Sequence, residues 1–249
     1  MNPILVCGAV LLSAVITVQA VHGSVVREED AGIAAYVQEL CEKTQSALEE
    51  QPPEAESRAS RSDWNLLLVN PWNALPAGFS VELESLGGGH SIDKRAAGEL
   101  NAMLAAARAE GLSPLIRSSY RTHSTQKTLY ANKVSQYTSR GYSRKEAEAR
   151  AGRIVALPGT SEHEAGLAVD IVAASYQTLN ERQERTAEQQ WLMANSYKYG
   201  FILRYPAGKS EITGIIYEPW HYRYVGAEAA KEIYERGLCL EEYLDKLPQ

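Results

Sequence analysis

The chain has 249 residues, a length that allows one large domain or two small ones. Apolar residues make up 45% and charged residues 22% of it, as in an ordinary globular protein with a hydrophobic core. The formal net charge of −6 argues against a protein that binds nucleic acid by neutralising phosphates, so no nucleic-acid partner is expected.

The N-terminal segment is predicted to direct export. No charged side chain precedes Arg27, and the run from Pro3 to Val18 is as apolar as the hydrophobic region of a signal peptide. The small residues of "VQA", which ends at Ala20, are typical of a signal-peptidase cleavage site. A retained membrane anchor is the alternative, because the stretch to Val21 is just long enough to span a bilayer.

Composition along the chain divides it into three parts. Residues 1–20 are the signal peptide or membrane anchor, residues 21–63 an N-terminal helix and polar linker, and residues 64–249 the main domain. The helix is expected over about 30–50, where apolar residues recur at helical spacing. The stretch "QPPEAESRASRSD" that follows is polar and contains prolines, as linkers do.

Three cysteines are present, Cys7, Cys41 and Cys239. If the segment with Cys7 is removed, the remaining two can form one disulfide in an exported protein. Two buried free thiols are the alternative, and the sequence leaves both open. The cysteines show no CxxC or other zinc-binding pattern.

Within the main domain, hydrophobic periodicity and capping residues predict the following elements in chain order. Strands are expected at "WNLLLVN", "PLIRSSYR", "LAVDIVAA", "FILRY" and "TGIIYEPWHYRYV", with a loop-rich stretch between the first of them and Gly89. Helices are expected from Ser91 to Gly111, over 124–139, from Ser143 (capping box with Glu146) to Ala156, from Thr186 (capping with Gln189) to Gly200, and over 227–237. Helices lie mostly in the first half and strands in the second. This order favours an α+β fold, with helices packed on a small, mainly antiparallel sheet.

Four polar residues stand close to or within apolar strands. His163 follows a Pro-Gly turn, Asp170 lies inside an apolar strand, and Glu218 and His221 flank a Pro-Trp pair in the last predicted strand. A carboxylate inside a strand is costly unless it is paired or bound to a metal. Two histidines and one carboxylate are a common ligand set of a catalytic zinc, with the fourth position left to water. A second carboxylate near that water can accept its proton.

The spacing of these residues is compatible with one site. Gly166 permits a close approach of the backbone where the turn enters the strand, so His163 and Asp170 can converge. Pro219 interrupts regular pairing and can redirect its neighbours' side chains. Each ligand candidate alone has an ordinary interpretation, such as a packed histidine or a turn-capping aspartate, but their combination favours a metal site. His90 is expected in a solvated loop.

Four separate segments, in order, resemble the zinc D-alanyl-D-alanine carboxypeptidases of the VanY type. That family shows SxHxxGxAxD followed by ExxH, and this chain has "SEHEAGLAVDI" and "EPWHYRYVG". "SSYRTHSTQKTLY" and "YGFILRYPAGKSEITGIIYEPWHYRYVG" are similar to the surrounding family segments. The resemblance extends from about residue 64 to the end of the chain. Ser119 and Thr122 stand where the family usually has Gly and Ser, which bears on fine substrate preference.

The resemblance implies a zinc peptidase of the bacterial cell envelope with one zinc ion per chain. The zinc ligands would be His163, Asp170 and His221. Glu218 would act as the general base and later as the acid. His123 is kept outside the ligand set.

The resemblance also implies the substrate, a peptidoglycan stem peptide ending in D-alanine. A monomer is expected, although the sequence does not show the oligomeric state. Arg121 would hold the terminal carboxylate or the oxyanion, and Ser161 and Gln126 would line the substrate pocket. A guanidinium fork binds a carboxylate with two parallel hydrogen bonds, whereas an ordinary surface salt bridge is the alternative for Arg121.

Two other functions stay open on the sequence alone. One is an endopeptidase of the same zinc fold, which would cut inside the stem peptide. The other is a non-catalytic zinc-binding domain similar to the hedgehog signalling domains. D,D and L,D carboxypeptidases act on adjacent bonds of the same stem with the same zinc chemistry, so the sequence does not separate them.

Overall fold

The structure is a computed structural model that describes residues 59–248. The predicted leader, the helix expected over 30–50, and Cys7 and Cys41 lie outside these residues. Cys239 is buried, and neither of the two alternatives for it, a disulfide with Cys41 or a free thiol, is tested. None of the helices within residues 59–248 is long and apolar enough to cross a membrane.

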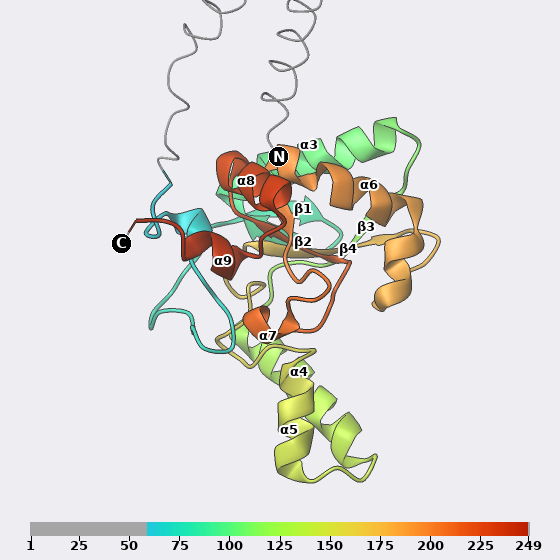
Figure 1. Cartoon of the computed structure of the whole chain (residues 1–249). Helices are drawn as coiled ribbons and strands as arrows, with labels where there is room; N and C mark the ends of the chain where they lie inside the picture. Colours follow the sequence, from blue (N-terminus) through green and yellow to red (C-terminus); the bar gives the residue numbers. More distant parts are fainter. Residues whose placement is uncertain (1–58, 249) are drawn as a thin grey trace, which may run out of the picture. The chain divides into compact units, whose positions relative to one another are not determined.

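The described chain contains helices, 3-10 turns and short strands in a mixed order (Figure 1). The helices are α3 (Lys94–Ala109), α4 (His123–Thr138), α5 (Arg144–Gly152), α6 (Ala187–Asn195), α7 (Ser210–Thr213), α8 (Ala227–Arg236) and α9 (Leu240–Leu244). The 3-10 turns are η1 (Trp64–Leu66), η2 (Glu181–Arg185) and η3 (Ser196–Tyr199). The strands are β1 (Leu83–Gly87), β2 (His90–Asp93), β3 (Pro114–Ser118), β4 (Ala168–Ala173), β5 (Phe201–Leu203) and β6 (His221–Tyr224).

The strands form two sheets. Strands β1 and β2 form an antiparallel hairpin, and the four-stranded sheet has the order β3-β4-β6-β5 with every neighbour antiparallel. Helices α3 and α6 pack on one face of this sheet, whereas α8 packs with Ile202 of β5, which lies opposite Arg223 and projects from the other face. The expected α+β class with a small antiparallel sheet is therefore confirmed.

The two faces of the sheet differ in chemistry because side chains alternate along each strand. Val169 and Ile171 of β4 and Tyr222 of β6 belong to the main hydrophobic core, together with Leu100 and Met103 of α3. The residues between them face the other way. The apolar face thus binds α3 and α6, and the opposite face carries polar side chains beside Ile202.

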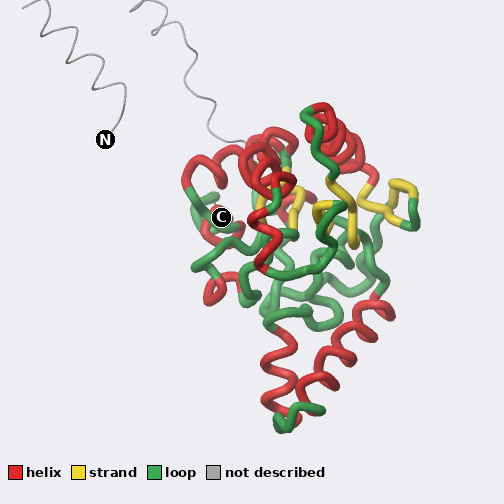
Figure 2. Tube along the Cα trace, turned by 90° about the vertical axis from the view of Figure 1, so that its right-hand side faces the viewer, coloured by secondary structure: helices red, strands yellow, loops and turns green. Residues whose placement is uncertain are grey.

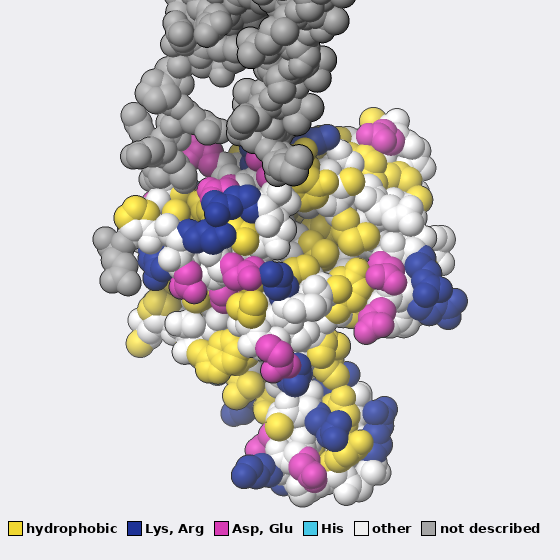
Figure 3. All heavy atoms as spheres, viewed as in Figure 1, with side chains coloured by type: hydrophobic (Ala, Val, Ile, Leu, Met, Phe, Trp, Pro, Cys, Tyr) yellow, Lys and Arg dark blue, Asp and Glu magenta, His cyan; other side chains and the backbone are white. Residues whose placement is uncertain are grey.

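Helices α4 and α5 form a hairpin that projects away from α3, α6 and α8 (Figures 1 and 2). It has its own small core of Val134, Ala147 and Ala151, with tyrosines packed against it. Lys and Arg side chains are prominent on this projection (Figure 3). Because the hairpin starts directly after Arg121, its first turns lie next to the polar face of the sheet.

Two predicted helix starts are confirmed at atomic detail. The Ser143 side chain accepts the Glu146 N–H while the Glu146 carboxylate accepts the Ser143 N–H, a complete capping box for α5. The Thr186 side chain accepts the Gln189 N–H at the start of α6. Both helices end earlier than predicted, α5 at Gly152 and α6 before the 3-10 turn η3.

The predicted strand "WNLLLVN" is wrong. It begins with the 3-10 turn η1 and ends at Asn70, whose side-chain oxygen accepts the backbone N–H groups of Trp72 and Asn73. Val69 is nevertheless fully buried. A short apolar run is compatible with a strand or with an irregular core segment, and here the asparagine turn decides for the second.

The hairpin β1–β2 was not predicted, and the start of α3 was placed too early. Ser91 lies within β2, and Asp93 caps α3 by accepting the Arg95 N–H. The glycines of the expected loop, residues 87–89, all have positive φ and form the turn of the hairpin. The "GGG" run therefore marks a tight turn rather than an open loop.

The last predicted strand is much shorter than expected. Of "TGIIYEPWHYRYV", only His221–Tyr224 pairs as β6. Glu218 lies in the preceding loop, where its N–H donates to the Tyr205 carbonyl at 3.2 Å, and Pro219 has no N–H to pair. Glu218 and His221 thus come from a loop and a strand rather than from one strand. Helices α7 and α9 were not predicted.

Candidate active site

The strand register places two of the predicted ligands side by side. Asp170 of β4 lies directly opposite His221 of β6 in the antiparallel ladder. Opposite residues project from the same face, and this is the face away from α3. Both side chains are almost fully buried.

The third predicted ligand comes from the turn before β4. His163 lies in the loop between the Pro-Gly turn and Gly166, whose φ of 71° is in the left-handed region. The Gly166 carbonyl accepts the Asp93 N–H at 2.8 Å, and a Cβ on Gly166 would lie 3.2 Å from a methyl of Val81. The close backbone approach expected at Gly166 is therefore present.

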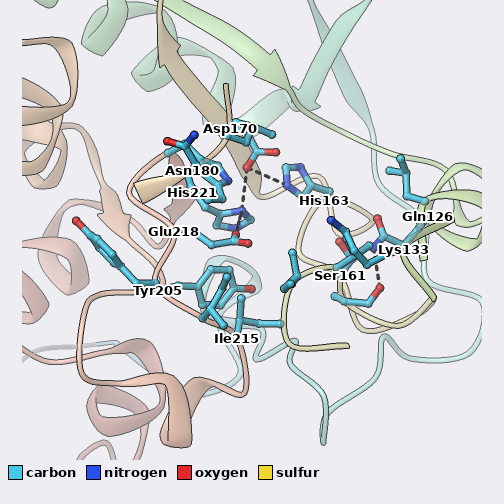
Figure 4. A pocket seen from close by; sticks show the side chains of 18 of the residues that line it. Gln126, Lys133, Ser161, His163, Asp170, Asn180, Tyr205, Ile215, Glu218 and His221 are labelled. Carbon is cyan, nitrogen blue, oxygen red and sulfur yellow. Dashed lines mark hydrogen bonds and ion pairs between the residues drawn. The ribbon is translucent and has the colours of Figure 1, made fainter. Parts of the chain in front are cut away.

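These three residues turn one donor atom each toward a common point (Figure 4). The Asp170 Oδ1 atom is 3.4 Å from His163 Nε2 and 3.1 Å from His221 Nδ1. All three donor atoms lie within 4.8 Å of one another. His163 Nδ1 is 2.8 Å from the Ser119 carbonyl, which only accepts, so Nδ1 carries the proton and Nε2 is free for a metal.

Two members of the set, His163 and Asp170, have the charge states that suit a divalent cation. Burial and the nearby Arg121 lower the pKa of His163 to about 4, so its ring is neutral. Burial opposes ionisation of Asp170, but the two histidines and Arg121 outweigh it and hold the pKa of Asp170 well below its usual range. Burial likewise disfavours charge on His221, but hydrogen bonds to Asp170 and Glu162 outweigh it and raise its pKa to about 9, so a bound metal would displace a proton from His221 Nδ1. Two imidazoles and one carboxylate, buried and convergent, fit zinc with one open position.

Glu218 lies beside this donor set. Its Oε2 atom is 3.8 Å from His221 Nδ1, and its side chain is buried. Burial is the main cause that raises the pKa of Glu218 to about 8. A bound cation would lower that pKa again, because opposite charge favours the carboxylate form. The site thus combines a metal-binding set with a separate carboxyl group that can exchange a proton near neutral pH.

Arg121 is placed next to the same set by three hydrogen bonds. Its guanidinium donates to Asp170 Oδ2 at 2.8 Å, to Ser118 Oγ at 2.9 Å and to Gln126 Oε1 at 3.3 Å. Gln126 is itself fully buried and donates to the Ala156 carbonyl. Arg121 is therefore held in one orientation at the wall of a pocket, and two of its five guanidinium N–H groups are not used by these bonds.

A cavity of about 850 Å³ opens onto these groups. Its walls include Arg121, Gln126 and Ser161, together with the donor set and Glu218. The structure thus brings all seven sequence-predicted site residues to one pocket. His123 does not belong to it, since its ring bonds Glu164 and its side chain is largely exposed.

Three contacts at the site were not anticipated. His90 is not in a solvated loop but opens β2, where its ring is 3.2 Å from Ser119 Oγ. The Ser119 carbonyl orients His163, as described above. Glu162 accepts from His221 Nε2 at 3.3 Å. The sequence signal for Glu162 was its place inside the motif "SEHEAG", but a glutamate in a turn is usually a solvated residue.

Comparison with known proteins identifies the family. Residues 89–227 match the family VanY: D-alanyl-D-alanine carboxypeptidase. A D-alanyl-D-alanine carboxypeptidase of Enterococcus faecalis is 48% identical over 191 residues, which cover 77% of this chain and 69% of that protein. The chain belongs to the VanY family of D-alanyl-D-alanine carboxypeptidases. The family and the activity expected from the sequence are confirmed.

Solved structures of VanY-like proteins show the same fold. VanYB in complex with D-alanine-D-alanine is 48% identical with a TM-score of 0.69, over 75% of this chain and 100% of that one. A VanY D,D-pentapeptidase mutant in complex with Zn(II) is 49% identical with a TM-score of 0.67, over 73% and 99%. The LdcB LD-carboxypeptidase is 42% identical with a TM-score of 0.63, over 74% and 88%. These proteins are peptidases, which favours the enzyme over the non-catalytic binding domain, and the Zn(II) complex agrees with the expected cofactor.

Proposed function

We propose that this chain removes the terminal D-alanine from peptidoglycan stem peptides and that His163, Asp170 and His221 hold the zinc ion. The observation that carries the proposal is the convergence of these three donor atoms within 4.8 Å, with Glu218 beside them. A zinc ion bound there polarises the scissile carbonyl and lowers the pKa of the attacking water.

Glu218 is proposed to move the proton. As a carboxylate it takes a proton from the attacking water, and as a carboxylic acid it gives that proton to the departing amine of D-alanine. Its buried position supports both steps, because burial raises its pKa toward neutrality and keeps bulk water from competing. Its place in a loop, rather than in β6, lets it approach the donor set from the side.

The pocket groups are proposed to orient the peptide. Arg121 has guanidinium N–H groups beyond its three hydrogen bonds, and these can bind the terminal carboxylate or the oxyanion. Ser161 and Gln126 line the same cavity and offer polar atoms to the substrate's end.

The test of these roles uses two variants. Glu218→Ala is expected to keep zinc and to lose D-alanine release by about 10²–10⁴-fold, because only the proton transfer is removed. His163→Ala is expected to lose both zinc and activity. D-alanine release from a purified stem pentapeptide and metal content by atomic spectroscopy are the measurements. Full hydrolysis by zinc-loaded Glu218→Ala would contradict the assignment of Glu218 as the group that transfers the proton.

D,D specificity is proposed, with L,D specificity as the second candidate. The D-alanyl-D-alanine carboxypeptidase of E. faecalis, at 48% identity, favours the first, and the LdcB LD-carboxypeptidase, at 42%, keeps the second in view. Mass spectrometry after incubation with tetrapeptide and pentapeptide stems separates them. Loss of one alanine from the pentapeptide alone supports D,D action, and loss from the tetrapeptide alone supports L,D action. An internal cut would instead indicate an endopeptidase.

Export is proposed on the apolar N-terminal segment described above, with cleavage after Ala20 or retention as a membrane tether. A substrate in the cell wall is consistent with export of the enzyme. Separately, we propose that the protein is a monomer. N-terminal sequencing of the protein from culture medium and from membranes distinguishes cleavage from tethering, and recovery of the full chain in the cytoplasm would contradict export.

A further inference from the structure

A buried carboxylate lies directly behind one of the proposed zinc ligands. Glu162 is almost completely buried, and its Oε2 atom is 3.3 Å from His221 Nε2. The other ring nitrogen, Nδ1, is the one that faces Asp170 and the metal position. The two nitrogens of His221 therefore have different partners, one inside the site and one behind it.

Two fully buried arginines hold Glu162 in this position. The Arg204 Nε atom donates to Glu162 Oε1 at 2.7 Å, and the Arg223 Nη1 atom donates to the same oxygen at 2.8 Å. Both cations use Oε1, so Oε2 is left to His221. The carboxylate is thus anionic and oriented, and only one of its oxygens is available to the ring.

The arginines are fixed in turn from outside the site. Arg204 makes two further bonds, at 2.7 and 2.8 Å, with the carboxylate of Glu241 in α9. Arg223 donates to the carbonyls of Asn65 and Leu67 at 3.0 and 2.9 Å. The two glutamates and two arginines together carry no net charge. Every member has a hydrogen-bond partner, so the network is a stable support that needs no ion from solvent.

We propose that Glu162 is a positioning residue for metal binding. By accepting the Nε2 proton of His221, it fixes the ring in the tautomer whose unprotonated Nδ1 points at the metal position. A carboxylate behind a histidine ligand also raises the electron density on the ligating nitrogen. This inference rests on the proposed ligand set and adds a residue that acts through His221 and does not touch the substrate.

A purely structural role for the network is the competing interpretation. Buried ion pairs often contribute little net stability, and the loss of one partner destabilises a fold whatever the network does for a ligand. Glu241 distinguishes the structural role from the positioning role, because it belongs to the network but has no hydrogen bond to His221. Neutralising Glu241 therefore tests the structural role alone.

The experiment compares Glu162→Gln with the matched control Glu241→Gln. In Glu162→Gln, the amide oxygen is expected to accept from the arginines, which turns the NH₂ group toward His221 and favours a proton on Nδ1. We expect zinc affinity, measured by competition with a chromophoric chelator, to fall roughly 10- to 100-fold. Glu241→Gln is expected to bind zinc about as tightly as the parent, because Glu241 bonds Arg204 and has no hydrogen bond to His221. The cobalt-substituted proteins supply a second readout, because an altered ligand changes the visible absorption of Co²⁺.

The outcomes separate the possible failures. If the parent protein binds no zinc, the proposed function fails and this inference fails with it. If the parent binds zinc and Glu162→Gln binds it equally well, or if both variants weaken binding to the same extent, only the positioning role is overturned. Circular dichroism monitors folding. Should Glu162→Gln not fold, the charge-balanced variant Glu162→Gln/Arg223→Gln replaces it, with the same expected loss of zinc affinity and the same overturning result.

Discussion

At the scale of single residues, the site depends on which nitrogen of each histidine is free. His163 turns Nδ1 to the Ser119 carbonyl and His221 turns Nε2 to Glu162, so each ring presents its other nitrogen to the metal position. One ring therefore uses Nε2 and the other Nδ1. The sequence motifs predict the ligand residues but carry no information on these acceptors, because Ser119 is far from His163 along the chain.

Gly166 is the residue whose backbone conformation delivers both His163 and Asp170. Gly166→Ala is expected to destabilise the fold by about 1–3 kcal/mol, because a non-glycine residue would occupy a left-handed φ of 71° beside Val81. Urea denaturation of the purified protein measures this change.

The matched control is Gly98→Ala in α3, an exposed helical position where an added Cβ meets nothing within 4 Å. This control is expected to stabilise by about 0.5–1 kcal/mol, because alanine is the better helix former. Equal effects of the two substitutions would show that the strained turn does not limit stability.

At the scale of elements, α4 forms one wall of the cavity. Its pocket-lining residues recur on one helical face and extend well beyond Arg121, in the order Gln126, Leu129, Asn132, Lys133 and Gln136. Figure 4 shows Gln126 and Lys133 on the side of the pocket away from Tyr205. The helix was predicted from the sequence, but which face it turns to the cavity was decided by how its hairpin packs.

Lys133 is the partly buried cation of this wall. It forms no ion pair with another of the described residues, and its charge is close enough to Glu218 to oppose the rise in that group's pKa. Lys133→Ala is expected to raise KM for a stem peptide by roughly 10-fold with kcat little changed, because one charge-assisted contact to a substrate carboxylate is lost. Lys127→Ala, exposed on the same helix and outside the cavity, is the control and should leave KM unchanged. Steady-state D-alanine release checks both, and an unaltered KM in Lys133→Ala would show that this cation does not meet the substrate.

At the scale of the whole molecule, the two faces of the four-stranded sheet have different roles, one in packing and one in the site. Its apolar face packs on α3 and α6 and supplies the main core, and its other face carries Asp170, His221 and Arg223. The buried network behind the site connects β6 and the loop of Glu162 to the C-terminal helix α9. Metal binding and global stability are therefore expected to be coupled.

Removal of zinc tests this coupling. A ligand present at 100 times its Kd stabilises the native state by about 2.7 kcal/mol. For a domain of this size, we expect chelation to lower the Tm by roughly 5–10 °C. Differential scanning calorimetry before and after chelation, and again after zinc is restored, measures the shift. Glu218→Ala should show the same shift, since Glu218 is outside the proposed ligand set. A Tm that does not respond to zinc would contradict a structural contribution of the metal.

The sequence by itself determined the chemistry and most of the elements. The motif spacing predicted His163, Asp170, His221 and Glu218 as site residues, and capping residues such as Ser143 placed helix starts, because these signals act over a few residues. Hydrophobic periodicity could not show whether "WNLLLVN" forms a strand; in the structure it ends in a turn closed by the Asn70 side chain. Periodicity also could not give the length of β6.

Only the tertiary structure decided the register that sets Asp170 opposite His221, the tautomer of each ring, and the burial of Glu162 between Arg204 and Arg223. The physical reason is that hydrogen bonds and desolvation join residues far apart in the chain. A glutamate that reads as a solvated turn residue can then become a buried anion held by two cations. Local sequence patterns contain the residues of such a network, but folding alone brings them within reach of one another.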